Sequence, residues 1–234
     1  MEILKGKYVL VAGATGGIGK QVVKLLHQSG AVVYAAGRNE TVLQQLGSEL
    51  QLPADRLLVV DVTQEHQVAQ AVQHLPQVDI LVNAAGIGII KSMDTLTLDD
   101  FNKSLQVNLV GTFNLVKAVL PQMKERKKGL IINIPGVLGK VPMAGAAAYS
   151  ASKYGIVGMM QSIREELKRT DIRITNLFLG GVDSAFWDTI DLRVQRDKMI
   201  VAEEAAKAIW FLCQQPTSGV VSEMVLQPFN HQAI

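Results

Sequence analysis

Hydrophobic residues recur along this chain in two patterns that alternate from one segment to the next. Short runs rich in Val, Ile and Leu, such as residues 57–60, are typical of strands covered on both faces. Apolar residues spaced three or four apart, such as Ile18 and Val22, are typical of helices that bury one side. Thr97, three residues before Asp100, predicts a capping box at the start of the longest helix. Strands are predicted at residues 7–12, 31–36, 56–60, 79–82, 130–134, 172–178 and 224–226, and helices at residues 18–30, 41–50, 66–74, 97–126, 149–170 and 203–214.

The alternation of strands and helices predicts the fold. Strands separated by helices pair in parallel through right-handed crossovers, which gives an α/β fold with a Rossmann-type doubly wound parallel sheet of about seven strands. The chain has 234 residues, of which 48% are hydrophobic and 19% charged, so it can bury a large sheet in a single domain over residues 1–234. In such a sheet the ligand binds beside the carboxyl ends of the strands.

Charge and composition exclude several classes of partner. Lys and Arg number 23 against 21 Asp and Glu, and the net charge of +2 predicts no nucleic-acid surface. The one basic cluster, residues 124–128, closes a predicted helix before Gly129, where cations complement the helix dipole and glycine suits a left-handed cap. The four histidines lack metal-ligand spacing, so no metal site is predicted.

Two further features predict a cytoplasmic protein. The apolar runs are far shorter than the ~20 residues that cross a bilayer, so no membrane association is expected. Cys213 is the single cysteine and cannot form an internal disulfide, and its position in a predicted helix favours a buried, inert thiol.

A glycine-rich turn joins the first predicted strand to the first helix. Glycine lets the backbone turn sharply and approach a ligand closely, so a pyrophosphate can rest on free amides at the positive end of the helix. Within a βαβ unit of about 30 residues this pattern predicts a dinucleotide site. The predicted binding residues of the turn are Gly13, Thr15, Gly16, Gly17, Ile18 and Gly19.

The end of the second predicted strand indicates which dinucleotide binds. NAD enzymes place a carboxylate there against the ribose hydroxyls, whereas this chain has Arg38. A guanidinium can bind a phosphate through two parallel hydrogen bonds. We therefore predict NADP(H), with its 2′-phosphate on Arg38; the alternative is an exposed arginine without a ligand.

Tyr149 and Lys153 start a predicted helix. Residues four apart lie on the same helix face, so the phenol and the ammonium can point into one pocket. A nearby cation stabilises the phenolate and is expected to lower the pKa of the tyrosine from about 10. Taken alone, such a pair is also common on ordinary helix surfaces.

Together these segments resemble the short-chain dehydrogenase/reductase family over nearly the whole chain. Asp61-Val62 matches its adenine contact, residues 83–86 its fourth-strand motif, and residues 180–184 the loop after its sixth strand. Asn108, Tyr149 and Lys153 match its catalytic positions. Besides the glycine turn and Arg38, the resemblance implies cofactor contacts from Asp61, Val62, Asn83, Ala84, Ala85, Gly86, Tyr149, Lys153, Gly180, Val182 and Ser184.

The resemblance also implies roles and an assembly. Tyr149 protonates a carbonyl oxygen as hydride leaves the nicotinamide, Lys153 holds the nicotinamide ribose and lowers the pKa of the tyrosine, and Asn108 holds a water that passes protons onward. In the family, the helices matching residues 97–126 and 149–170 pair across a two-fold axis, which implies a homodimer or homotetramer.

A second branch of the family offers an alternative. The spacing Gly13-x-x-Gly16-x-x-Gly19 also matches the extended relatives that act on nucleotide sugars. Those relatives need a sizeable C-terminal substrate domain, and only about 50 residues follow Gly181.

Three positions depart from the family pattern. The catalytic serine stands thirteen positions before the tyrosine, which is Gly136 here, and residues 130–148 contain no serine or threonine. Losing one donor to a developing oxyanion costs about 10²–10³-fold in rate. Two milder changes are Leu179 in place of a proline and Ala12 in place of a threonine.

The residues therefore predict an NADPH-dependent reductase, with a catalytically silent NADPH-binding regulatory or scaffold protein as the alternative. Substrate contacts are expected from residues 87–91, 141–143 and 185–199. Met143, Phe186 and Trp187 within these segments favour a small apolar ketone or aldehyde.

Overall fold

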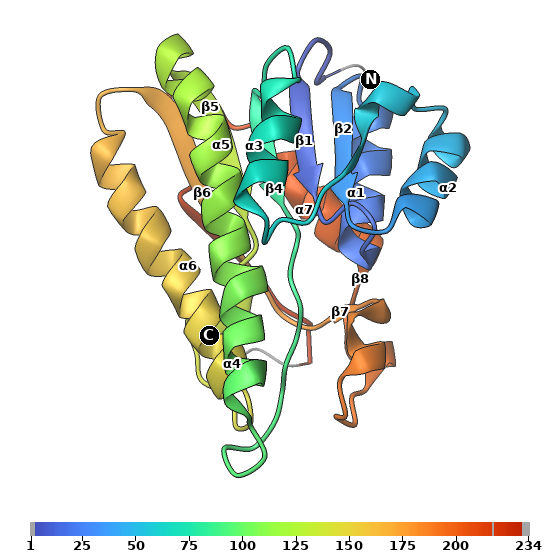
Figure 1. Cartoon of the computed structure of the whole chain (residues 1–234), viewed down its shortest axis with the longest axis vertical. Helices are drawn as coiled ribbons and strands as arrows, with labels where there is room; N and C mark the ends of the chain where they lie inside the picture. Colours follow the sequence, from blue (N-terminus) through green and yellow to red (C-terminus); the bar gives the residue numbers. More distant parts are fainter. Residues whose placement is uncertain (1–2, 217, 231–234) are drawn as a thin grey trace.

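Seven parallel strands form the central sheet, in the order β3-β2-β1-β4-β5-β6-β9 (Figure 1). The computed structural model describes residues 3–216 and 218–230, so both ends of the predicted domain and His231 lie outside the described residues. The prediction of a doubly wound parallel sheet of about seven strands is confirmed. The strands are β1 (Tyr8–Ala12), β2 (Val32–Gly37), β3 (Leu57–Val59), β4 (Ile80–Asn83), β5 (Lys128–Asn133), β6 (Asp171–Leu179) and β9 (Glu223–Leu226).

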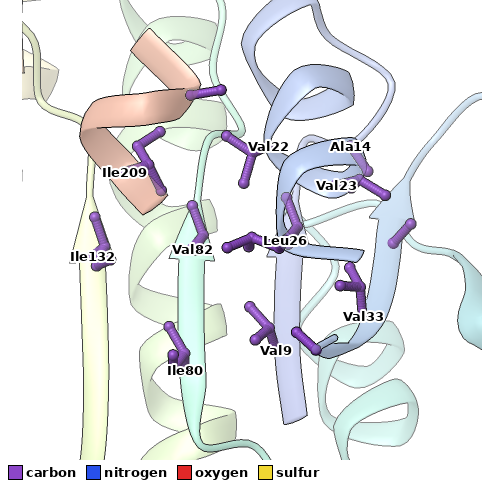
Figure 2. Close-up of a cluster of buried hydrophobic side chains, with 14 of the residues drawn as sticks. Val9, Ala14, Val22, Val23, Leu26, Val33, Ile80, Val82, Ile132 and Ile209 are labelled. Carbon is purple, nitrogen blue, oxygen red and sulfur yellow. The ribbon is translucent and has the colours of Figure 1, made fainter. Parts of the chain in front are cut away.

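Two layers of helices cover the sheet because its strands are apolar on both faces. The helices are α1 (Gly17–Gln28), α2 (Glu40–Leu50), α3 (Glu65–Gln73), α4 (Leu98–Ser104), α5 (Gly111–Arg126), α6 (Ala147–Glu166) and α7 (Ala202–Leu212). On one face α1, α2 and α7 pack on the sheet, as Figure 2 shows for Leu26 and Ile209 beside Val9 and Val82. On the other face α3, α5 and α6 bury a second cluster that includes Leu81 and Ile131.

The segment between β4 and β5 differs from the prediction. Thr97 caps α4 in the predicted capping box with Asp100, but the single helix expected over residues 97–126 is wrong. The π-helical turn η2 (Leu105–Val110) separates α4 from α5. A π-helical turn adds only about one residue to a turn of α-helix. The spacing of apolar residues on either side therefore still looks like that of one continuous helix.

The end of α5 also differs from the prediction. Gly129 is not the helix cap: Lys127 takes the left-handed conformation with φ 53°, and Gly129 lies inside β5. A Cβ at Gly129 would lie 2.5 Å from Sδ of Met123, so packing against α5 explains this glycine. A short second sheet, β7 (Val182–Asp183) with β8 (Ile200–Val201), was not predicted.

Candidate active site

The glycine turn after β1 is closed against two neighbouring loops. Gly13 has φ +81°, and a Cβ there would lie 2.6 Å from the carbonyl carbon of Ala84 at the end of β4. A Cβ at Gly17 would lie 2.6 Å from Cβ of Ser184, in the loop after β6. Glycine at these two positions therefore lets the carboxyl ends of β1, β4 and β6 converge.

The amino end of α1 opens onto this convergence. Gly16 is the N-cap, no side chain bonds the free amides, and the first turn carries no acidic residue. Uncapped amides at the positive end of a twelve-residue helix suit a phosphate group. Ile18 anchors the turn by packing against the core on this face of the sheet.

Arg38, Asp61 and Val62 lie at the ends of the next two strands outward. Arg38 is exposed directly after β2, and a Cβ at Gly37 would lie 2.8 Å from Cγ2 of Thr15, so the glycine turn adjoins the strand end that leads to Arg38. Oδ1 of Asp61 accepts hydrogen bonds from the Thr63 amide and hydroxyl, each 2.9 Å long. Val62 is 8% exposed.

The motif at residues 83–86 follows β4 in the middle of the edge. Asn83 is buried and donates to Oγ1 of Thr112 at 2.7 Å, so its amide points toward α5. Ala84 N donates to Ala12 O at 2.9 Å, and Ala85 packs against the core shared with α5 and α6. A Cβ at Gly86 would lie 3.0 Å from Oδ1 of Asn108 and 3.5 Å from Nζ of Lys153.

Tyr149 and Lys153 project from the start of α6, as their spacing predicts. Nζ of Lys153 lies 5.3 Å from the centroid of the Tyr149 ring and donates to Ile134 O at 3.1 Å. Burial lowers the pKa of Lys153 to about 8. Burial also raises the pKa of Tyr149 above its usual value, so the expectation of a lowered phenol pKa is wrong for the protein as it stands.

Asn108 sits in the π-helical turn and is fully buried. Its Oδ1 accepts from Ile87 N at 2.8 Å, and its Nδ2 donates to Ile87 O at 3.0 Å. Its carbonyl oxygen accepts the Thr112 hydroxyl at 2.6 Å. The side-chain amide is therefore occupied by protein partners, and a water held by Asn108 would have to bind its carbonyl oxygen.

Gly136 differs from a serine in backbone as well as in side chain. It has φ +70°, in the left-handed region, and a Cβ there would lie 3.4 Å from Leu179 O. An L-residue is strained in this conformation. The loop after β5 is therefore built for glycine.

The segment after Ser184 lies beside Tyr149. The Phe186 ring lies 6.1 Å from the Tyr149 ring, centroid to centroid, and 5.4 Å from the Trp187 ring. A Cβ at Gly88 would meet the end of the Phe186 ring and lie 2.6 Å from Cδ1 of Ile190. Of the residues expected to form an apolar wall, Phe186 contacts the Tyr149 ring, and Trp187 contacts Phe186.

Arg196 holds this segment to the loop after β6. Its Nε donates to Asp183 at 2.5 Å and its Nη1 donates to Asp188 at 2.7 Å. Two further hydrogen bonds hold the same region: Nε1 of Trp187 donates to Val182 O at 2.9 Å, and Gly180 N donates to Leu226 O at 2.8 Å.

The predicted site residues fall into two groups along one edge of the sheet. Tyr149, Lys153, Asn108 and Gly86 meet between β4 and α6, whereas Arg38 and the Asp61-Val62 pair lie at the strand ends beyond β1. Met143 is 37% exposed.

Sequence analysis missed three buried hydroxyl groups at this site. Ser104 and Thr112 flank Asn108 at intervals of four residues, and Ser152 precedes Lys153. All three are at most 2% exposed, and each hydroxyl donates a hydrogen bond to a backbone carbonyl oxygen of α6 or of the π-helical turn. The sequence does contain a signal for these groups, because Ser104, Asn108 and Thr112 are polar residues four apart on one face of a helix.

Comparison with known proteins identifies the chain. The family model described as short chain dehydrogenase matches residues 7–194. The chain belongs to this family. This short chain dehydrogenase is 31% identical over 232 residues to an uncharacterized oxidoreductase of Staphylococcus epidermidis, covering 97% of this chain and 100% of the relative.

Solved structures of the same architecture include two of serine dehydrogenase. The enzyme from Escherichia coli has a TM-score of 0.85 and 28% identity, covering 96% of this chain and 99% of the other. A closed form complexed with NADP+ has a TM-score of 0.87 and 28% identity, covering 96% of both chains. Within the described ranges of this short chain dehydrogenase, the helices are too short or too polar to cross a membrane.

Proposed function

We propose that this protein is an NADPH-dependent carbonyl reductase whose substrate is a small apolar ketone or aldehyde. One observation carries the proposal: the Tyr149 phenol and the Lys153 ammonium lie together at the carboxyl edge of the sheet, with the glycine turn along the same edge. A proton donor and a phosphate-binding turn on one sheet edge are what reduction of a carbonyl group by a dinucleotide needs.

The protonation states of the pair suit reduction. Because burial raises the pKa of Tyr149, its phenol keeps a proton at neutral pH and acts as an acid. The proton passes from Oη of Tyr149 to the carbonyl oxygen, a step that a positioned donor accelerates by about 10²–10⁴-fold. Lys153, with a pKa of about 8, is mostly charged at neutral pH and stabilises the phenolate left behind.

The residues along the edge fit NADPH, which supplies the hydride when it binds. The uncapped amides of α1 suit its diphosphate, and Arg38 its 2′-phosphate. Asp61 and Val62 would contact the adenine, residues 83–86 and Lys153 the nicotinamide ribose, and Gly180, Val182 and Ser184 the nicotinamide. The NADP+ complex of the serine dehydrogenase relative supports the choice of NADPH.

The apolar wall supports the substrate class. Phe186 and Ile190 pack on Gly88, and the Phe186 ring contacts the Tyr149 ring. Gly136 offers no side-chain donor, so the developing oxyanion has one donor fewer than in a serine-containing site. A turnover about 10²–10³-fold below such a site is expected.

A second candidate function is a catalytically silent NADPH-binding regulatory or scaffold protein. The position of Phe186 against Tyr149 favours it, since the ring occupies space that a carbonyl compound needs. The two candidates share NADPH binding and differ in turnover.

The proposed assembly is a homodimer or homotetramer in the cytoplasm. Phe113 on α5 and Tyr154 on α6 are each 44% exposed, and both helices cover the same face of the sheet (Figure 1). Such exposed aromatic residues suit a subunit interface. Light scattering at several protein concentrations tests the assembly, and a monomer throughout contradicts it.

NADPH oxidation measured with a panel of ketones and aldehydes tests the function. We expect Tyr149→Phe to abolish turnover and to leave the NADPH Kd within about twofold, because the variant loses only the transferable proton. Tyr154→Phe, an exposed tyrosine on the same helix, is the matched control and retains activity. NADPH binding with no turnover on any carbonyl compound would favour the silent protein.

A further inference from the structure

Three buried polar side chains connect the two sides of the proposed active site. Ser104 at the end of α4, Asn108 in the π-helical turn and Ser152 in α6 each have 0% exposure. Polar groups this deeply buried need hydrogen-bond partners. These side chains form hydrogen bonds with one another and with the backbone carbonyl groups of Ile87 and Tyr149.

The direction of each hydrogen bond follows from counting hydrogens. Ser152 has one hydroxyl hydrogen, and it is donated to Tyr149 O at 2.6 Å. Its oxygen therefore accepts from Nδ2 of Asn108 at 3.0 Å. The second hydrogen of Nδ2 is donated to Ile87 O, also at 3.0 Å. Ser104 makes longer contacts: its hydroxyl lies 3.2 Å from Ala148 O and 3.4 Å from Oγ of Ser152, and its oxygen lies 3.4 Å from Nδ2 of Asn108.

We propose that Ser152 is a positioning residue for carbonyl reduction, because it fixes Asn108, and through Asn108 the loop at Ile87, relative to Tyr149. The inference rests on the proposed function of the same site. Without the Ser152 hydroxyl, one N–H of Asn108 loses its 3.0 Å acceptor and has only the Ser104 oxygen, 3.4 Å away, in a site that water does not reach. The amide then turns to find another partner, and the two bonds that hold Ile87 weaken.

A displacement of Asn108 also affects the surroundings of the proposed proton donor, because Gly86 lies between Asn108 and Lys153. A Cβ there would lie 3.0 Å from Oδ1 of Asn108 and 3.5 Å from Nζ of Lys153, so the three groups are in close contact. A shift of Asn108 therefore opens space beside Lys153 on one side and moves the loop of Ile87 on the other. Ser152 thus sets the separation between the start of α6 and the loop that follows β4.

Steady-state kinetics and hydrogen exchange on Ser152→Ala test the proposal. We expect kcat to fall about tenfold or more and the NADPH Kd to stay within about twofold, because the geometry of proton transfer is lost and the phosphate-binding turn is untouched. The alkaline limb of the kcat profile moves upward by about half a pH unit or more, since water reaches Lys153. The Ile87 amide, which donates to Asn108, exchanges faster.

Matched variants separate this role from general destabilisation. Ser162→Ala removes a hydroxyl from the same helix, where it donates to Gly158 O at 3.2 Å, and should change none of these quantities. Ser152→Thr keeps the hydroxyl and should restore both kcat and Ile87 protection. Should Ser152→Ala fail to fold, Ser152→Cys carries the same measurements, since sulfur is a weak donor and acceptor.

Two results would overturn the proposal. One is a Ser152→Ala protein with kcat and Ile87 exchange like those of the wild type. The other is a loss of kcat with unchanged Ile87 exchange, since the effect would then not pass through Asn108. If the wild type oxidises no NADPH, the proposed function fails, and the Ile87 exchange rate still decides whether Ser152 holds the loop.

Discussion

The ring of Phe186 lies against the ring of Tyr149, with centroids 6.1 Å apart and planes inclined at 53°. This separation is within the range of direct aromatic contact, about 4.5–7 Å. Phe186 therefore provides an aromatic surface directly beside the proposed proton donor. The segment η4 (Ala185–Thr189) that carries this ring is held by Arg196.

Replacing Phe186 with Ala tests whether this ring forms a wall of the substrate site. We expect the KM for a small apolar ketone to rise about tenfold, because burying an aromatic side chain of this size contributes about 1.5–3 kcal/mol. Initial rates at saturating NADPH measure the change. Phe211→Ala on α7, where the ring is 56% exposed, is the control and should leave KM unchanged. An unaltered KM in Phe186→Ala would place substrate elsewhere.

Replacing Arg38 with Ala tests the choice of dinucleotide. We expect the Kd of NADPH to rise by about 10–100-fold, since a charge-assisted hydrogen bond contributes about 1.5–3 kcal/mol, and the Kd of NADH to change little. Fluorescence titration of both nucleotides measures this. Arg169→Ala, an exposed arginine just after α6, controls for net charge. Equal loss of NADH and NADPH binding would refute a phosphate contact.

The buried ammonium of Lys153 predicts how stability varies with pH. Its pKa of about 8 lies below the unfolded value of 10.5, so between these pH values the unfolded chain binds more protons and the free energy of unfolding rises with pH. Below pH 8 the burial costs about 3 kcal/mol. Lys153→Met should therefore be more stable than the wild type at pH 7, and the difference should shrink toward pH 10.5. Urea unfolding across this range measures it, and a pH-independent difference contradicts the shift.

Restoring the absent hydroxyl by Gly136→Ser is expected to fail. The φ of +70° makes an L-residue strained by about 1–2 kcal/mol, so the variant loses stability and gains no turnover. Gly158→Ser is the matched control, because a Cβ at this helical glycine meets nothing within 4 Å and should be neutral or stabilising. Chemical denaturation and initial rates compare the two. A more active Gly136→Ser protein would show that the loop can rearrange.

Most strands and helices could be predicted because their apolar periods are regular. β1, β4 and α7 follow their predicted spans within a few residues, and the position of the site followed from the parallel sheet alone. The π-helical turn η2 could not be predicted from the local pattern. Within it, Asn108 accepts a hydrogen bond from the amide of Ile87, 21 residues away in the chain, and no helical period reveals such a contact.

The chemistry of single groups was harder to predict than their location. The spacing of Tyr149 and Lys153 correctly predicted that they meet, yet the pKa of the phenol depends on how deeply the folded chain buries it. Likewise the sequence at Gly136 reveals a lost side chain, whereas the left-handed backbone that requires glycine emerges only from the surrounding loops.

The π-helical turn gives α4 and α5 different rotational settings about a nearly common axis. The residues before it face α6, as Ser104 does, and those after it face the sheet, as Thr112 does beside Asn83. If the six residues Leu105–Val110 wound as ordinary α-helix instead, α5 would be rotated by about 100° relative to α4, and Thr112 would turn away from Asn83. The local winding of this short stretch therefore decides which side chains of α5 reach the sheet.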